Sequence, residues 1–331
     1  MTAADAPHVL ITTAFLKPGG EVEAILHEAG ARVSFFPKPA DSPQEFAAAF
    51  QDADAVIAGT QPITADMIET APRLRVIART GVGYDSVDVA AASRAGVAVC
   101  VTPGTNRQAV AEHVFALMLA AARDVPSNIA EVAAGTWTQR SGRELCGSTL
   151  GIVGLGSIGK TVALLGKAFG MRVVAYDPYF DAEFGAAHEV ERMELTELLS
   201  SSDFITLHLF LDETTRNLIN ADALSRTKPG AIIVNTARGG IVDEAALAAA
   251  VREGRVGGAG LDVFESEPLP ANSPLLGLPR VITTGHVAGA TEEARHRSGL
   301  LAAEIVVAAL NGADIPHAVN NDRVRVEAGA R

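Results

Sequence analysis

Cysteine is nearly absent from this 331-residue sequence. Its two cysteines, Cys100 and Cys146, are too few and too far apart in the chain to indicate a disulfide framework or a metal site. Cys100 lies within an apolar run, which predicts a buried thiol of the core. We therefore expect no structural disulfide and no bound metal.

Basic clusters and long apolar runs are also missing, and no secretion signal is expected. The formal net charge is −12 and no cluster of basic side chains offsets it, which argues against a nucleic-acid partner. No apolar run approaches the roughly 20 residues needed to cross a bilayer. Residues 1–7 lack the basic and apolar parts of a secretion signal. We expect a cytoplasmic protein that binds neither membrane nor nucleic acid.

The composition is that of a globular protein too long for one domain of usual size, so two domains are expected. Short apolar segments alternate with segments of helical spacing, which predicts α/β architecture with parallel sheets covered on both faces. The predicted strands are residues 8–12, 32–36, 55–58, 76–78, 97–100, 150–153, 172–176, 204–209, 231–235, 258–263 and 281–284. The predicted helices are residues 21–30, 43–50, 65–70, 108–123, 161–169, 220–226, 244–253 and 291–310.

The helix predicted over residues 108–123 is apolar nearly all round. Such a helix is either deeply buried or part of a subunit interface. Residues 102–106, just before it, have the composition of a linker, and residues 131–145 form a polar excursion.

A glycine-rich turn follows the strand predicted over residues 150–153. Gly154, Gly156 and Gly159 form a G-x-G-x-x-G pattern between a strand and a helix, the arrangement that binds the pyrophosphate of a dinucleotide. The next predicted strand ends in Asp177, whose carboxylate can accept hydrogen bonds from ribose hydroxyls and would repel a 2′-phosphate. Without a ligand, the same pattern would be only a tight strand-to-helix turn. The combination predicts NAD as the cofactor.

Three groups lie at predicted strand ends in the second half of the chain. Arg238 follows residues 231–235 and can clamp a carboxylate at two points, although it could also be a surface arginine. Acidic residues follow the next strand, over residues 262–267, and His286 follows the strand after that. A lone histidine is often structural, but beside an arginine and acids at one sheet edge it suits a proton shuttle.

These motifs, in this order and spacing, resemble those of the D-isomer-specific 2-hydroxyacid dehydrogenases, in particular the 3-phosphoglycerate dehydrogenase branch. The resemblance covers residues 78–310 with specific motifs and the earlier residues more loosely. It rests on the loop at residues 79–85, the segment at 106–116, the glycine turn and the signatures around Arg238, residues 262–268 and His286.

The resemblance implies roles for the site residues. Arg238 would hold the substrate carboxylate and 2-oxygen, His286 would exchange the hydroxyl proton, and Glu267 would orient His286 and stabilise its protonated form. The substrate-binding residues implied, besides Arg238, are Val82, Gly83 and Asn106. The cofactor-binding residues are Gly154, Gly156, Ser157, Ile158, Gly159, Asp177, Leu209, Thr236 and Asp262, of which Asp262 would hydrogen-bond the nicotinamide carboxamide.

The resemblance also implies the architecture. Two Rossmann-like or flavodoxin-like doubly wound domains with parallel sheets are expected, with the active site in the cleft between them. Residues 1–101 and 291–331 would form the substrate-binding domain, and residues 102–290 the NAD-binding domain. We expect a homodimer through the NAD domain, because the family pairs there and the helix over residues 108–123 is too apolar to face water.

This sequence departs from the family pattern at several positions. Ser157 replaces a frequent arginine, and Phe210 and Gly285 each replace a usual proline. Residues 58–60 lack the arginine that phosphoglycerate-using relatives carry to bind phosphate, a role that Arg140 or Arg143 could take.

The expected activity is NAD-dependent oxidation of a D-2-hydroxy acid, at its CH–OH group, to the 2-oxo acid, or the reverse. The alternatives on the same scaffold are a glyoxylate or hydroxypyruvate reductase and a formate- or phosphite-type dehydrogenase. Formate-type enzymes carry glutamine where Glu267 stands, which counts against them. A different class, an NAD-sensing transcriptional co-repressor, also uses this fold.

Overall fold

A computed structural model describes residues 6–36 and 42–320 of the chain. Its contacts divide the chain into two compact units. Unit 1 comprises Met1–Asn106 and Thr291–Arg331, and unit 2 comprises Arg107–Ala290. The first boundary between the units therefore follows Asn106. The sequence analysis put it after residue 101.

Unit 1 is built on a parallel sheet whose strand order, within the described residues, is β2-β1-β3-β4-β5. This is the flavodoxin-like order. β1, β3, β4 and β5 are buried along their whole length, which explains their continuous apolar runs. The strands are β1 (His8–Ile11), β2 (Arg32–Phe35), β3 (Ala55–Ala58), β4 (Val76–Arg79) and β5 (Ala98–Cys100).

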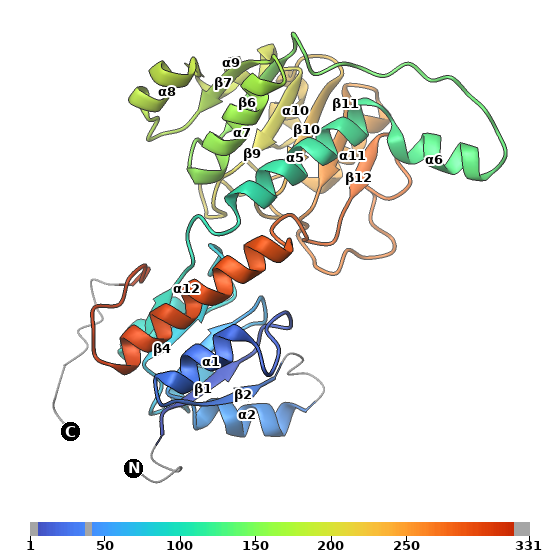
Figure 1. The fold of residues 1–331 in the computed structure, drawn as a ribbon. Coiled ribbons are helices and arrows are strands. Elements are labelled where there is room, and N and C mark those ends of the chain that lie inside the picture. Colours follow the sequence, from blue (N-terminus) through green and yellow to red (C-terminus); the bar gives the residue numbers. More distant parts are fainter. Residues whose placement is uncertain (1–5, 37–41, 321–331) are drawn as a thin grey trace. The chain divides into compact units, whose positions relative to one another are not determined.

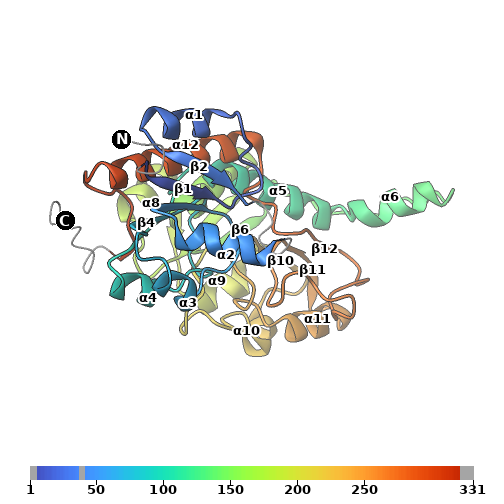
Figure 2. The ribbon, with the colours of Figure 1, turned by 90° about the horizontal axis from the view of Figure 1, so that it is seen from below.

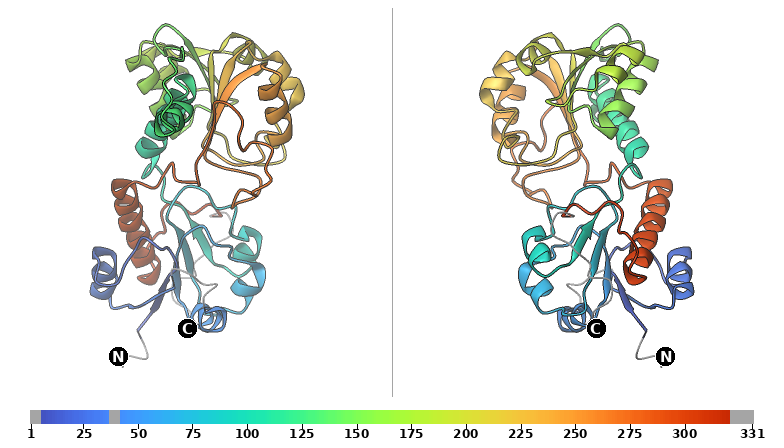
Figure 3. Two further views of the ribbon diagram at one scale, coloured as in Figure 1. Left: turned by 90° about the vertical axis from the view of Figure 1, so that its right-hand side faces the viewer. Right: turned by 90° about the vertical axis from the view of Figure 1, so that its left-hand side faces the viewer.

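Helices cover both faces of the unit 1 sheet (Figure 3). One face carries α1 (Glu21–Glu28) and α12 (Glu292–Leu310), the other α2 (Pro43–Gln51), α3 (Ala65–Glu69) and α4 (Val89–Arg94). α12 comes from the end of the chain, yet it lies along this sheet against β3 and β4 (Figure 1).

As predicted, the Cys100 thiol is buried, and this burial raises its pKa to about 12.

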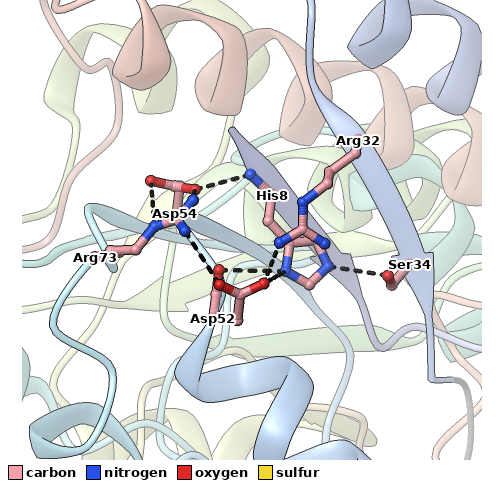
Figure 4. Close-up of polar contacts among 6 residues, drawn as sticks. All are labelled: His8, Arg32, Ser34, Asp52, Asp54 and Arg73. Carbon is pink, nitrogen blue, oxygen red and sulfur yellow. Dashed lines mark hydrogen bonds and ion pairs between the residues drawn. The ribbon is translucent and has the colours of Figure 1, made fainter. Parts of the chain in front are cut away.

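A polar cluster lies where the strands of unit 1 begin (Figure 4). His8, at the start of β1, places Nδ1 3.3 Å from the Asp52 carbonyl oxygen and Nε2 2.9 Å from Ser34 Oγ. Arg32 and Arg73 form ion pairs with Asp52, and Arg73 also pairs with the buried Asp54. Burial, followed by the positive charge of Arg32, lowers the pKa of His8 below its usual 6.5.

Unit 2 is also built on a parallel sheet, with the order β12-β11-β10-β9-β6-β7-β8 within the described residues. The order reverses between β6 and β9, and a doubly wound sheet binds its ligand at such a switch point. The strands are β6 (Thr149–Val153), β7 (Arg172–Tyr176), β8 (Glu191–Arg192), β9 (Phe204–Leu207), β10 (Ala231–Asn235), β11 (Val256–Leu261) and β12 (Val281–Thr283). The prediction of doubly wound, parallel-sheet α/β domains is therefore confirmed.

The helices of unit 2 also lie on both faces of its sheet (Figure 3). α5 (Arg107–Ala122) and α7 (Ser157–Ala168) pack on one face, and α9 (Leu195–Ser201), α10 (Ala221–Arg226) and α11 (Glu244–Arg252) on the other. The sequence analysis began α7 four residues late, at residue 161, and missed α4, α8 (Ala182–His188), β8 and α9. Side-chain caps begin two of these short helices: Asp88 accepts from the Ala91 amide in α4, and Asp181 accepts from the Phe184 amide in α8.

α5 is covered by its own unit. Most apolar side chains of this helix are buried against α7, β10 and β11, among them Val114, Phe115 and Met118, whereas Gln108, Glu112 and Ala116 form an exposed stripe. Of the two explanations for its apolar surface, deep burial is therefore correct. The burial of α5 within its own unit does not by itself call for a partner subunit, and the homodimer stays a prediction.

α6 (Val125–Ala133) was not predicted, and it stands away from the sheet and helices of unit 2 (Figures 1 and 2). Val125, Ile129 and Val132 are spaced to share one helix face, and all three are exposed. The Trp137 side chain, just beyond the helix, is 83% exposed.

Among the helices that the structure describes, none is long and apolar enough to cross a membrane.

Candidate active site

The glycine turn joins β6 to α7 at the switch point of the unit 2 sheet. Gly154 has a φ of 100°, and a β-carbon there would come within 2.5 Å of the His208 carbonyl oxygen. A β-carbon on Gly159 would come within 2.1 Å of the Gly154 carbonyl oxygen. The turn can therefore take this shape only with glycine at both positions.

The amino end of α7 is open. Gly156 is its N-cap and has no side-chain cap among the described residues, and a β-carbon on it would meet nothing within 4 Å. Ser157 is exposed and Ile158 half-buried at the first turn of the helix. Uncapped amides at a helix amino end, with open space before them, suit an anionic pyrophosphate.

Asp177 lies at the carboxyl end of β7, beside the glycine turn. Its carboxylate accepts hydrogen bonds from the Leu155 amide at 2.6 Å and the Tyr179 amide at 2.7 Å. These bonds fix the side chain and leave lone pairs for the hydroxyls of a ribose.

The carboxyl ends of the neighbouring strands β9 and β10 carry the other predicted cofactor residues. The Leu209 side chain packs within 3.0 Å of the β-carbon position of Gly154. Thr236 Oγ1 is buried and has no hydrogen-bond partner among the described residues. A buried hydroxyl without a partner is costly unless a ligand supplies one, so these residues fit a bound dinucleotide.

Arg238 lies in the loop that follows β10. The Asn235 side chain braces this loop, because its Nδ2 donates to the Arg238 carbonyl oxygen at 2.8 Å and its Oδ1 accepts from the Ala237 amide at 3.0 Å. Gly239 brings the loop against the chain after β11, since a β-carbon on it would lie 2.0 Å from the Phe264 carbonyl. The half-buried guanidinium donates to the Ala237 carbonyl oxygen at 2.6 Å.

Glu267 and His286 form a direct pair. Glu267 Oε2 lies 2.8 Å from His286 Nδ1, and Oε1 of the same carboxylate accepts from the Phe264 amide at 3.1 Å. The side chains are 38% and 40% exposed, so a substrate can reach the imidazole. Because an ionised carboxylate can only accept, Nδ1 carries a proton and Nε2 is left to exchange a proton with a ligand.

Asp262 is wholly buried beneath the turn that carries His286. Its Oδ1 accepts from Thr284 Oγ1 at 2.5 Å and from the Val287 amide at 2.9 Å, and its Oδ2 accepts from the Ala288 amide at 2.8 Å. Burial raises the pKa of Asp262, but hydrogen bonds from His113, Thr284 and these amides outweigh it and lower the pKa below its usual 3.8. The carboxylate is therefore ionised, and its contact with a carboxamide stays a prediction.

The substrate-binding residues implied by the resemblance, Val82, Gly83 and Asn106, belong to unit 1. Val82 and Gly83 lie in the loop that follows β4. The Arg79 Nε atom donates to the Gly83 carbonyl oxygen at 3.1 Å, and the Gly81 carbonyl oxygen accepts from the Thr102 amide at 2.9 Å. Bonds from both sides thus hold this loop.

Arg140 and Arg143 are engaged elsewhere in unit 2. Arg140 forms an ion pair with Glu131. Arg143 donates to Asp203 at 2.8 Å, at the beginning of β9 and therefore at the sheet edge opposite the glycine turn. Both arginines are thus paired with carboxylates of their own unit, and a role for either in binding phosphate stays a prediction.

Three polar residues near the site were assigned no catalytic role from the sequence, which favoured packing for His208 and packing or a subunit contact for His113. His208, after β9, lies 3.0 Å from Thr206 Oγ1, and burial lowers its pKa to about 3, so it stays neutral. His113 of α5 lies 3.1 Å from Thr284 Oγ1. The sequence could have pointed to Thr284, because it is a hydroxyl residue at a strand end, two positions before His286.

Known proteins resemble this chain in sequence and in structure. Residues 115–288, more than half of the chain, match the model of the D-isomer specific 2-hydroxyacid dehydrogenase, NAD binding domain. This match confirms NAD as the cofactor.

Relatives and a solved structure extend the match. The chain is 47% identical over 276 residues to the D-3-phosphoglycerate dehydrogenase of Mycobacterium tuberculosis, covering 82% of this chain but 52% of that protein. It thus spans about half the length of this relative. It is 42% identical to the glyoxylate reductase of Korarchaeum cryptofilum, covering 83% of this chain and 85% of that one. The TT0316 protein from Thermus thermophilus matches with a TM-score of 0.85 and 36% identity, over 94% of this chain and 99% of that one. The chain therefore belongs to the D-isomer specific 2-hydroxyacid dehydrogenase family.

Proposed function

We propose that the protein is an NAD-dependent D-2-hydroxyacid dehydrogenase that interconverts a D-2-hydroxy acid and its 2-oxo acid. The observation that carries this proposal is the Glu267–His286 pair, 2.8 Å apart at the same sheet edge as the glycine turn. A carboxylate-oriented imidazole at a dinucleotide site is suited to moving the proton that accompanies hydride transfer.

When bound, NAD would supply the acceptor for the hydride from C2 of the hydroxy acid, and the glycine turn and Asp177 would hold it. Arg238 binds the substrate carboxylate with its planar fork and orients C2. His286 Nε2 takes the proton of the 2-hydroxyl during oxidation and returns it during reduction. Glu267 holds the ring in the tautomer that leaves Nε2 free and stabilises the imidazolium.

The proposal is tested by following NADH oxidation with a panel of 2-oxo acids that includes pyruvate, glyoxylate, hydroxypyruvate and 3-phosphohydroxypyruvate. We expect turnover with at least one of them, and a fall in kcat of about 10²–10⁴-fold in His286→Ala, the range for losing a general acid–base group. NADH binding by that variant should stay nearly normal. Absence of turnover throughout would remove the enzymatic proposal and favour an NAD-sensing co-repressor.

Two substrate classes compete within this activity. Similarity to the mycobacterial D-3-phosphoglycerate dehydrogenase supports a phosphorylated hydroxy acid. A glyoxylate or hydroxypyruvate reductase is supported by the ion pairs that hold Arg140 and Arg143 and by the absence of arginine from residues 58–60. The ratio of kcat/KM for hydroxypyruvate to that for 3-phosphohydroxypyruvate decides between them. The glutamate at position 267 remains the argument against a formate-type enzyme.

We also propose that the protein is a homodimer, now on the basis of α6 rather than α5. The apolar face formed by Val125, Ile129 and Val132, together with Trp137, is exposed on unit 2. Exposed apolar surface of this kind is typical of interfaces between proteins. A second copy of the chain is the occupant that the family resemblance implies.

A further inference from the structure

His113 takes part in a hydrogen-bonded chain that ends beneath the turn carrying His286. Its Nε2 lies 3.1 Å from Thr284 Oγ1 and 3.5 Å from Asp262 Oδ1. Thr284 Oγ1 in turn lies 2.5 Å from Asp262 Oδ1. The three side chains come from α5, from the end of β12 and from the end of β11, so they join parts of unit 2 that are distant in sequence.

The chemistry of Asp262 fixes the direction of this chain. Its ionised carboxylate can only accept, so the Thr284 hydroxyl must give it its single proton. The Thr284 oxygen can then only accept from His113, whose Nε2 must carry a proton. The order of donation is therefore His113 to Thr284 to Asp262.

The packing of α5 on β11 explains why His113 reaches this position. A β-carbon on Gly260 would come within 2.6 Å of Leu117 Cβ, so the bare strand lets the helix approach closely there. His113 lies one helical turn before Leu117, about 6 Å along the axis. Asp262 lies two residues beyond Gly260, about 6.6 Å along the strand. The two spacings match, which brings the imidazole to the Asp262 end of the strand.

The buried carboxylate holds the turn in its conformation. His286 has a φ of 54°, which side-chain-bearing residues seldom adopt. The Val287 and Ala288 amides donate to the Asp262 carboxylate, and the His286 amide donates to the Asp262 carbonyl oxygen at 2.8 Å. These bonds offset the strain of the turn and direct the His286 ring to Glu267.

We propose that His113 and Thr284 are positioning residues, which lock Asp262 so that its bonds hold His286 in the orientation that contacts Glu267. The inference rests on the acid–base role proposed for His286. It gives α5, through His113, a part in positioning His286. The family resemblance does not imply this part.

The test compares variants that remove one of the hydrogen bonds between His113, Thr284 and Asp262 with variants that keep a hydrogen-bond donor at the same position. Thr284→Val and His113→Leu should each lower kcat about tenfold, the fold-change for losing one hydrogen bond to a charged group. Thr284→Ser and His113→Gln should recover most of that loss. NADH affinity should change less than kcat in all four variants, because none of the substitutions removes a side chain that binds the cofactor directly in the proposed site. Equal kcat values in the breaking and the conservative variants would overturn the proposal.

The matched control is Thr227→Val, which removes another buried hydroxyl of unit 2, one that donates to the Leu224 carbonyl oxygen at 2.8 Å. It should cost stability without changing kcat. An equal fall of kcat in this control would show that loss of any buried hydroxyl slows the enzyme, and would also overturn the proposal.

Histidine ¹⁵N spectra make the test independent of activity. We expect the His113 signals to show a proton on Nε2, and the His286 signals to move in Thr284→Val but not in Thr227→Val. A proton on Nδ1 alone, or unmoved His286 signals, would overturn the proposed chain. If the unmodified protein turned over none of the 2-oxo acids while the spectra agreed, only the proposed function would fail.

Discussion

The backbones of Gly239 and Phe264 are in contact. A β-carbon on Gly239 would lie 2.0 Å from the carbonyl carbon and oxygen of Phe264 and 2.5 Å from the Glu265 amide nitrogen. The contact joins the loop of Arg238 to the segment that leads to Glu267. Because the neighbours are backbone atoms, no side-chain rotation can relieve a larger residue here.

Gly239→Ala should therefore displace the two loops and disable the site. A displacement of about 1 Å can cost about 100-fold in rate, so we expect kcat with the best 2-oxo acid to fall by about that factor. The control is Gly30→Ala, where φ is +81° and a β-carbon would meet nothing within 4 Å. It should lose about 1 kcal/mol of stability to backbone strain and keep its kcat. A normal kcat in Gly239→Ala would show that the contact does not position the site.

Glu267→Gln should shift the pH profile of reduction. Reduction requires protonated His286, and the amide stabilises an imidazolium less well than the carboxylate does. The high-pH limb of kcat/KM should therefore move to lower pH, with a smaller loss of rate than in His286→Ala. The measurement is kcat/KM against pH for both proteins. An unmoved limb would mean that this carboxylate does not couple to His286.

Asp177→Ala should weaken NAD binding and relax the discrimination against NADP. The carboxylate supplies acceptors for the ribose hydroxyls and repels a 2′-phosphate, so we expect KM for NAD to rise about tenfold. Asp222→Asn, which alters an exposed carboxylate paired with Arg226 on α10, is the control and should change neither value. Preference of the unmodified protein for NADP would contradict this role of Asp177.

Unit 1 should lose stability as the pH falls below about 6.5. The reason is that the folded state lowers the pKa of His8 and so disfavours the protonated imidazole. The Asp52 carbonyl oxygen can only accept, so Nδ1 donates to it and Nε2 accepts from the Ser34 hydroxyl. The folded state lowers the pKa of His8, so between that value and about 6.5 the unfolded chain binds the extra proton. This group lowers the free energy of unfolding by up to about 1.4 kcal/mol per pH unit in that window, and not above it.

Urea unfolding at several pH values checks this expectation. His8→Asn keeps a donor near the Asp52 carbonyl oxygen but cannot titrate, so its stability should fall less between pH about 6.5 and 5. His27→Asn, which removes a largely exposed imidazole of the same unit, should behave as the unmodified protein does. Equal pH dependence in His8→Asn and the unmodified protein would exclude His8 as the cause.

Charging the apolar face of α6 should dissociate the proposed dimer. Ile129 and Val132 are 66% and 60% exposed, and glutamate at both positions would place two charges in the interface. Light scattering should give twice the 34.3 kDa of one chain for the unmodified protein and one chain mass for the double variant. Leu276→Glu, at an exposed apolar residue elsewhere on unit 2, should stay dimeric. A monomeric unmodified protein would refute the homodimer.

Local patterns predicted most of the fold. Buried parallel strands are continuous apolar runs, and Gly154 and Gly159 mark a turn by their spacing alone. α6 was missed because its apolar residues, such as Ile129, face outward and are followed by a polar stretch. α8 was missed because so short a helix depends on its cap, here Asp181, more than on periodicity; α9 was missed as well, and it has no side-chain cap among the described residues. His113 and Thr284 are 171 positions apart in the chain, and only the packing of α5 against β11 brings them together.

The division of unit 1 between the two ends of the chain has a consequence for synthesis on the ribosome. α12 supplies Ala302, Ile305 and Val306 to the core beneath β3 and β4. Until that helix is translated, one face of the first sheet has only part of its cover, from α1, whereas unit 2, being continuous, is complete at Ala290. Because domains fold as units while the chain emerges, the segment encoded in the middle finishes folding first and the segment encoded first must wait. A chain cut short after Ala290 would leave apolar strands of unit 1 uncovered, and such strands are the ones that aggregate.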